Sequence, residues 1–142
     1  MKDYINRWLL LMLALIAIIV IVGGLTRLTG SGLSMVDWQP IMGSVPPLSA
    51  MDWAVTFEAY KQSPEFQKIN MSMTLSEFKF IFYWEYIHRM IGRLIGLVAV
   101  IPFLFFIIKK QLSNAFIKHW LGVIILIGCQ GFFSDSLRIR IL

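Results

Sequence analysis

Long apolar runs limit what this chain can fold into more than any other feature. Residues 8–25 contain no charged side chain, and apolar residues also dominate 78–108 and 115–133. About 20 apolar residues in a helix cross the ~30 Å hydrocarbon core of a bilayer. Hydrophobic residues make up 58% of the chain and charged residues 15%, against about 25% charged in a soluble domain. These runs predict an all-α integral membrane protein with three transmembrane helices.

The 142 residues are expected to form one membrane domain, with a long loop over 26–74 between the first two spans. Within this loop, Ser49 and Asp52 have the spacing of a capping box, and Trp53, Phe57 and Tyr60 recur at helical spacing. A short amphipathic helix is therefore predicted. It either lies on the membrane or packs over the ends of the other helices.

Capping signals also locate the later helices. Thr74 and Glu77 form a second capping box, which predicts a helix from Leu75 to about Ile108. Ser113 and Asn114 are expected to cap the third span. Residues 134–142 are expected to form a separate tail, and Trp8 an anchor at the membrane surface.

The net charge of +5 is spread along the chain, without the clustered basic patch of a nucleic-acid-binding protein. Residues 109–118 carry three lysines and no acid, so the positive-inside rule places this connection and the N-terminus on the cytoplasmic or matrix side. Arg138 and Arg140 oppose that orientation. The single Cys129 excludes an internal disulfide.

The second span carries an unusual group of ionisable residues: Glu85, His88, Arg89 and Arg93. At 100° per residue, Glu85, His88 and Arg89 share one face of the helix. Such groups are costly in lipid and usually face a bundle interior or a cavity. Counted back along the helix from Lys109, the group lies near the outer membrane surface.

Each of these residues has alternative uses. His88 is suited to be an axial ligand of haem iron, or it is an interfacial histidine hydrogen-bonded to a neighbour. Glu85 is a proton acceptor beside a cofactor, or the partner of Arg89 in an i,i+4 ion pair. Arg93 would meet a haem propionate or another helix, or extend towards the membrane surface.

Residues 23–34 leave the first span at the same outer surface. Arg27 in this segment either binds a propionate carboxylate or is an ordinary charge beside the membrane. Its glycines are expected to give tight turns. Gly92 and Gly96 have the small-xxx-small spacing that suggests the close approach of another helix or of a flat ligand. His119, beside Lys118, is expected to be an interfacial residue on the opposite side.

Several segments in order resemble the haem A synthase family, specifically the mitochondrial and related bacterial type whose first external loop lacks a cysteine pair. They are residues 23–34 (Gly-Gly-Leu-Thr-Arg-Leu-Thr-Gly-Ser-Gly-Leu-Ser), 37–40, 46–48, 60–65, 73–79, and 85–93 with the pattern Glu-x-x-His-Arg-x-x-Gly-Arg. The resemblance runs from about residue 8 to Phe133.

This resemblance implies an eight-helix enzyme of two similar four-helix halves in the bacterial plasma membrane or the mitochondrial inner membrane. The family oxidises the C8 methyl of haem O to the formyl group of haem A, for cytochrome oxidase biogenesis. By carry-over, His88 is an axial ligand to the iron of the substrate haem and Glu85 the catalytic carboxylate. Arg27, Arg89 and Arg93 are candidate propionate contacts. The haem b site would lie in the C-terminal half.

The resemblance covers roughly the first two-fifths of the family's length, without the fourth helix that would carry the partner histidine of His88. A truncated product, inactive alone, is the resulting expectation. The candidate partners are a complementing chain, haem O synthase or a second copy of the chain. A non-enzymatic haem-binding or assembly-factor module is the alternative. A small proton-coupled transporter is disfavoured, because Glu85 lies at the outer edge and not at mid-membrane.

Overall fold

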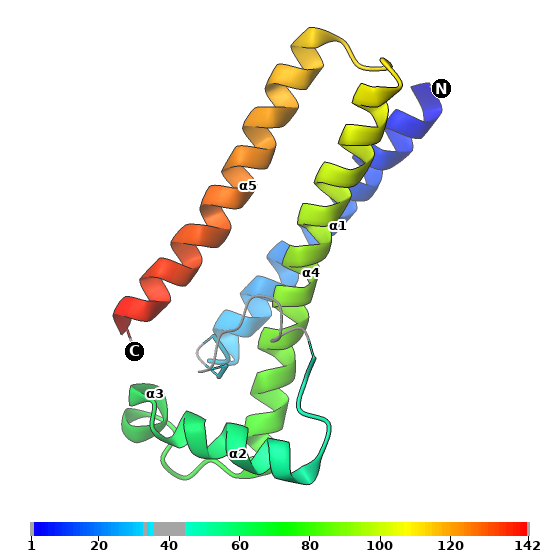
Figure 1. Cartoon of the computed structure of the whole chain (residues 1–142). Helices are drawn as coiled ribbons and strands as arrows, with labels where there is room; N and C mark the ends of the chain where they lie inside the picture. The colour runs from blue at the N-terminus through cyan, green and yellow to red at the C-terminus, as the bar shows by residue number, and fades with distance from the viewer. Residues whose placement is uncertain (1, 33, 36–44, 142) are drawn as a thin grey trace. The chain divides into compact units, whose positions relative to one another are not determined.

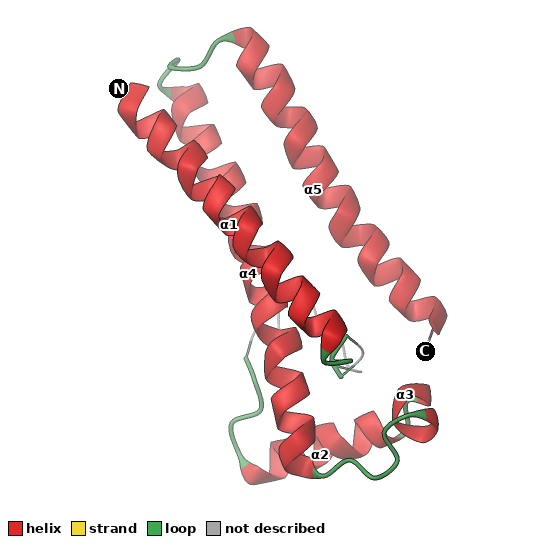
Figure 2. Cartoon of the chain, turned by 180° about the vertical axis from the view of Figure 1, so that it is seen from behind, coloured by secondary structure: helices red, strands yellow, loops and turns green. Residues whose placement is uncertain are grey.

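The computed structural model describes residues 2–32, 34–35 and 45–141. For Lys2 and residues 132–141 it describes the backbone alone. All regular structure in these residues is helical, as Figure 2 shows. The helices in Figure 1 are α1 (Lys2–Leu28), α2 (Ala50–Lys61), α3 (Pro64–Lys68), α4 (Leu75–Ile108) and α5 (Asn114–Ile141). The predicted all-α class is confirmed. Leu33, the segment 37–40 and the side chains of Arg138 and Arg140 lie outside the described part.

The helix starts follow the capping signals closely. Thr74 N donates to Glu77 Oε2 at 2.7 Å and Glu77 N donates to Thr74 Oγ1 at 3.4 Å, so α4 begins at Leu75 as predicted. Phe116 N donates to Ser113 Oγ at 3.2 Å at the start of α5. The helix α5 continues to Ile141, beyond the predicted end of the third span at Phe133. Residues 134–141 contain no Gly or Pro to stop it.

Two helical segments among the described residues are long and apolar enough to cross a membrane: Asp3–Leu28 and Leu75–Ile108. They correspond to the first two predicted spans, and both helices extend beyond the expected apolar runs. The helix of the third predicted span is present as α5, whereas its crossing of the membrane stays a prediction.

The described chain divides into two compact units, one of Met1–Ile19 with Ile91–Ile141 and one of Val20–Met90. The core of the first unit joins the beginning of α1 to the second half of α4 and to α5. Its buried members are Trp8, Met12, Ile95, Ala99, Phe103 and Phe106. The core of the second unit joins α2 and α3 to the first turns of α4.

Trp8 does not have the predicted role of a surface anchor, because its side chain is only 6% exposed. Its ring meets Trp120 of α5 edge-on, with 4.7 Å between ring centroids, and also contacts Phe106. Helical periodicity puts Trp8 on the same face of α1 as Met12, and that face packs against α4. Tertiary packing therefore overrides the preference of tryptophan for the membrane surface.

A proline inside α4 explains where the indole N–H groups point. Pro102 has no backbone N–H, so the carbonyl of Val98 loses its ordinary helix partner. Trp8 Nε1 donates to that carbonyl at 2.7 Å, and Trp120 Nε1 donates to the next carbonyl, Ala99, at 3.1 Å. Lipid offers no hydrogen bond to an open carbonyl, so the bond from Trp8 compensates for the N–H that Pro102 lacks.

The predicted loop helix is α2, and its capping box is present. Ser49 N donates to Asp52 Oδ2 and Asp52 N donates to Ser49 Oγ, both at 3.0 Å. Trp53 and Tyr60 are buried against Phe78 at the start of α4, with the Tyr60 and Phe78 rings stacked at 4.9 Å. Figure 1 shows α2 across the beginning of α4. Of the two predicted uses, the structure shows the packing one.

Candidate functional site

The end of α1 is shaped by a glycine. Gly30 has φ +62°, and the backbone around it forms a Schellman cap: Ser31 N donates to Thr26 O at 2.9 Å and Gly30 N to Arg27 O at 3.3 Å. Here the predicted tight turn is confirmed. The cap stops the helix and turns the following residues back towards α4.

This turn buries two serines. Ser31 and Ser34 are both 0% exposed. The hydroxyl of Ser31 donates to Thr26 O at 3.0 Å, and Ser34 N donates to Ser31 O at 3.4 Å. Because these bonds hold the short segment together, Ser34 and Met35 reach the side of α4 in a defined position.

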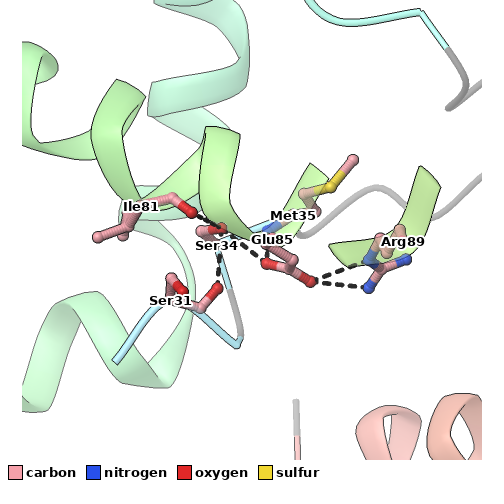
Figure 3. Close-up of polar contacts among 6 residues, drawn as sticks. All are labelled: Ser31, Ser34, Met35, Ile81, Glu85 and Arg89. Atoms are coloured by element: carbon pink, nitrogen blue, oxygen red, sulfur yellow. Dashed lines mark hydrogen bonds and ion pairs between the residues drawn. The ribbon is translucent and has the colours of Figure 1, made fainter. Parts of the chain in front are cut away.

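Glu85 of α4 is the centre of the resulting polar cluster, shown in Figure 3. Its Oε2 accepts hydrogen bonds from Ser34 Oγ at 2.6 Å and Met35 N at 2.9 Å. Its Oε1 accepts from Arg89 Nη2 at 2.8 Å and Arg89 Nε at 3.1 Å. We call Ser31, Ser34, Met35, Glu85 and Arg89 the Glu85 network.

Burial gives this network its electrostatic importance. Glu85 is 4% exposed, and a buried carboxylate is costly unless donors and an opposite charge compensate for lost water. Both its oxygens have such donors, and the ion pair with Arg89 is the i,i+4 pairing that the spacing allowed. The structure thus joins the segment that follows α1 to the charged group of α4, which are separate motifs in the sequence. The proton-acceptor role of Glu85 remains a prediction.

His88 lies one turn after Glu85 and next to α1. A Cβ built on Gly23 would be 3.1 Å from His88 Nε2 and 3.5 Å from Cδ2, so the imidazole lies directly against the glycine backbone. The ring is partly buried. Among the described residues, none makes a hydrogen bond to the imidazole of His88, unlike His119, whose Nδ1 is 2.7 Å from Ala115 O.

The candidate arginines differ in their surroundings. Arg27 is exposed in the last turn of α1, and its guanidinium has no ion-pair or hydrogen-bond partner in the described part of the chain. Arg89 is engaged by Glu85. Arg93 is partly buried, belongs to the other compact unit and has contacts of its own.

Sequence reasoning missed the serines and misplaced one close approach. No pattern in 23–34 signals that Ser34 would be buried on a carboxylate of α4. A Cβ on Gly92 would meet only Ile19 Cδ1, at 3.6 Å, and one on Gly96 nothing described within 4 Å. Neither glycine is therefore required by a tight helix contact in the described structure. The close contact is at Gly23, which was expected only to allow a turn.

Comparison with known proteins places the chain in a family. The sequence model of the COX15-CtaA family, described as cytochrome oxidase assembly protein, matches residues 6–134. The chain therefore belongs to this family of membrane proteins, in agreement with the predicted resemblance over 8–133. No solved structure matches the chain.

The similar curated proteins are named Heme A synthase. The chain is 50% identical to the one of Nitrosomonas eutropha over 124 residues, which are 87% of this chain and 35% of the relative. It is 51% identical to that of Nitrosospira multiformis, with the same coverage. It is 50% identical to the heme A synthase–mitochondrial ferredoxin fusion protein of Schizosaccharomyces pombe, of which it covers 20%. The chain thus spans about a third of the length of its bacterial relatives.

Proposed function

We propose that this chain forms the substrate-haem half-site of a haem A synthase-like membrane oxidoreductase. The reaction is oxidation of the C8 methyl of haem O to the formyl group of haem A, for cytochrome oxidase biogenesis. The observation that carries the proposal is His88: an imidazole on a membrane helix, one turn from a buried carboxylate, without a hydrogen-bond partner among the described residues.

The surroundings of His88 fit a haem. Neutral imidazole is a common axial ligand of haem iron. The Nε2 edge of the His88 ring lies against the Gly23 backbone, so Nδ1 is the nitrogen proposed to meet the iron. When bound, the iron porphyrin supplies the oxidative chemistry, and the protein supplies binding and orientation.

Glu85 is proposed as the catalytically important carboxylate. Both of its oxygens are held by donors, so the carboxylate would lie beside a bound haem in a fixed orientation, one turn from His88, with its charge balanced by Arg89.

The arginines are proposed as propionate contacts, in an order that the structure supports. Arg27 comes first because its guanidinium is exposed and has no described acidic partner. Arg89 can reach a propionate only while it also neutralises Glu85. Arg93 comes third. Guanidinium groups bind carboxylates with two parallel hydrogen bonds, which suits this task.

The remaining parts of the enzyme are proposals by family membership. The partner ligand of His88 and a haem b site belong to the length of the relatives that this chain does not span. A complementing chain, haem O synthase or a second copy are the proposed partners. The bacterial plasma membrane or the mitochondrial inner membrane is the proposed location, with the N-terminus on the cytoplasmic or matrix side. The description cytochrome oxidase assembly protein also fits the alternative of a non-enzymatic assembly module.

The first test is haem binding by the purified chain in detergent, followed by absorbance. We expect a Soret shift with wild type, and its loss in His88→Ala. His119→Ala is the matched control, because the chain has two histidines and His119 is exposed and bonded within its own helix. Identical spectra for wild type and His88→Ala would remove His88 as the ligand.

A further inference from the structure

The contact between α1 and the imidazole of His88 depends on a missing side chain. A Cβ at Gly23 would come within 3.1 Å of His88 Nε2, closer than ordinary van der Waals contact allows. The neighbouring Gly24 is different: a Cβ there would meet no described atom within 4 Å. Two adjacent glycines of one helix therefore have different surroundings: an added side chain would press on His88 at Gly23 and would meet no described atom at Gly24.

The backbone on each side of this contact is held by other bonds. On α1, the Schellman cap at Gly30 fixes the helix end, and Thr26 Oγ1 donates to the Gly23 carbonyl at 2.8 Å. On α4, Glu85 is tied to Ser34 and Met35 of the segment that follows α1. A side chain added at Gly23 would thus meet two restrained backbones, and the ring of His88 is the part most able to move.

We infer that Gly23 is a positioning residue for His88: the absence of a side chain lets the Nε2 edge of the imidazole lie against α1, and so sets the ring orientation in which Nδ1 is left to meet haem iron. This inference rests on the proposed haem site. It adds a residue of α1 to the haem site. Neither the Glu-x-x-His pattern in α4 nor the expected role of glycine in turns predicts that residue.

The size of the effect follows from rotamer energetics. A movement of the ring by a few tenths of an ångström relieves the contact with an added Cβ. Gly23→Ala is therefore expected to lower haem affinity only roughly two- to tenfold. Gly23→Val requires a larger displacement and is expected to remove the Soret shift.

The experiment titrates ferric protoporphyrin IX into wild type, Gly23→Ala, Gly23→Val, Gly24→Ala, Gly24→Val and His88→Ala in detergent. Absorbance gives affinity and spin state, and circular dichroism checks that each variant is folded. Both glycines lie in the same helix, so the change in helix propensity is the same at each position. We expect the Gly24 variants to match wild type and the Gly23 variants to lose haem affinity in order of side-chain size.

A second readout needs no haem. The two histidines give two sets of imidazole NMR signals, assigned by loss of one set in His88→Ala. Gly23→Ala is expected to shift the His88 signals and leave those of His119 unchanged, while Gly24→Ala shifts neither. If Gly23 and Gly24 variants behave alike in both readouts, the positioning role is wrong. If His88→Ala binds haem as wild type does, the haem site itself is wrong, and the NMR comparison still decides whether Gly23 orients the ring.

Discussion

At the scale of single residues, the buried carboxylate of Glu85 decides the local structure. Glu85 lies in α4, one of the two helices long and apolar enough to cross a membrane. Some of the hydrogen-bond donors to its carboxylate come from a distant part of the sequence. Ser34 contributes a hydroxyl at 2.6 Å and Met35 a backbone N–H at 2.9 Å. The segment after α1 is therefore held to α4 by polar bonds.

Ser34→Ala is expected to lower the free energy of unfolding by about 1–3 kcal/mol, because a buried carboxylate oxygen loses a donor. Thermal unfolding in detergent, followed by circular dichroism, measures the change. Ser72→Ala is the matched control, since Ser72 is exposed, and it should leave the unfolding curve unchanged. Equal curves for the two variants would show that the hydroxyl contributes nothing.

The ion pair can be measured with a double-mutant cycle of Glu85→Gln and Arg89→Gln. We expect a coupling free energy of about 1–3 kcal/mol, because removing one charge leaves the other buried. The ion pair of Glu58 and Lys61, at 2.6 Å and more exposed, is the internal comparison and should give about 0–1 kcal/mol. A coupling at Glu85 no larger than at Glu58 would contradict the importance given to burial.

At the scale of helices, Trp8 of α1 donates a hydrogen bond to the Val98 carbonyl that Pro102 leaves without a helical partner. Trp8→Phe should destabilise the protein by about 1 kcal/mol through the lost interhelical hydrogen bond. In a Pro102→Ala background the Val98 carbonyl regains a helical N–H, so the same substitution should cost less. Stability in detergent of the four chains of this cycle tests the coupling, and strict additivity would show that the indole does not compensate for the proline.

Tyr60 of the loop helix α2 is expected to make the free energy of unfolding depend on pH. Burial raises the pKa of its phenol, partly offset by the hydrogen bond from Asn70 Nδ2 at 2.9 Å. Because the folded pKa lies above the unfolded value of about 10, this contribution to stability is complete below pH ~10 and is lost as the pH rises through the folded pKa.

Comparing wild type with Tyr60→Phe in unfolding experiments over this alkaline range isolates the contribution of Tyr60. The stability of wild type should fall more steeply with pH than that of Tyr60→Phe. Tyr4→Phe, at an exposed tyrosine, should retain the wild-type slope. Parallel slopes for wild type and Tyr60→Phe would contradict the raised pKa.

At the scale of the whole molecule, the number of spans and their direction remain predictions. The three-span topology predicts that Ser49→Cys in the loop and Ser113→Cys before α5 lie on opposite sides of the membrane. In a Cys129→Ser background, a membrane-impermeant thiol reagent added to sealed vesicles of one orientation should label only one of them. Labelling of both from the same side would contradict the predicted crossing of α4.

The sequence by itself determined the helical class, the membrane environment, the starts of α2, α4 and α5, and the family. These follow from local quantities: apolar run length, helical period and capping boxes such as Thr74 with Glu77. It could also place Glu85, His88 and Arg89 on one face, since they belong to one helix. Only the tertiary structure decided that Ser34 bonds to Glu85, that Gly23 supports His88 and that Trp8 is buried. Each of these joins residues distant in the chain, and their pairing depends on how α1 and its following turn pack against α4, which no local pattern encodes.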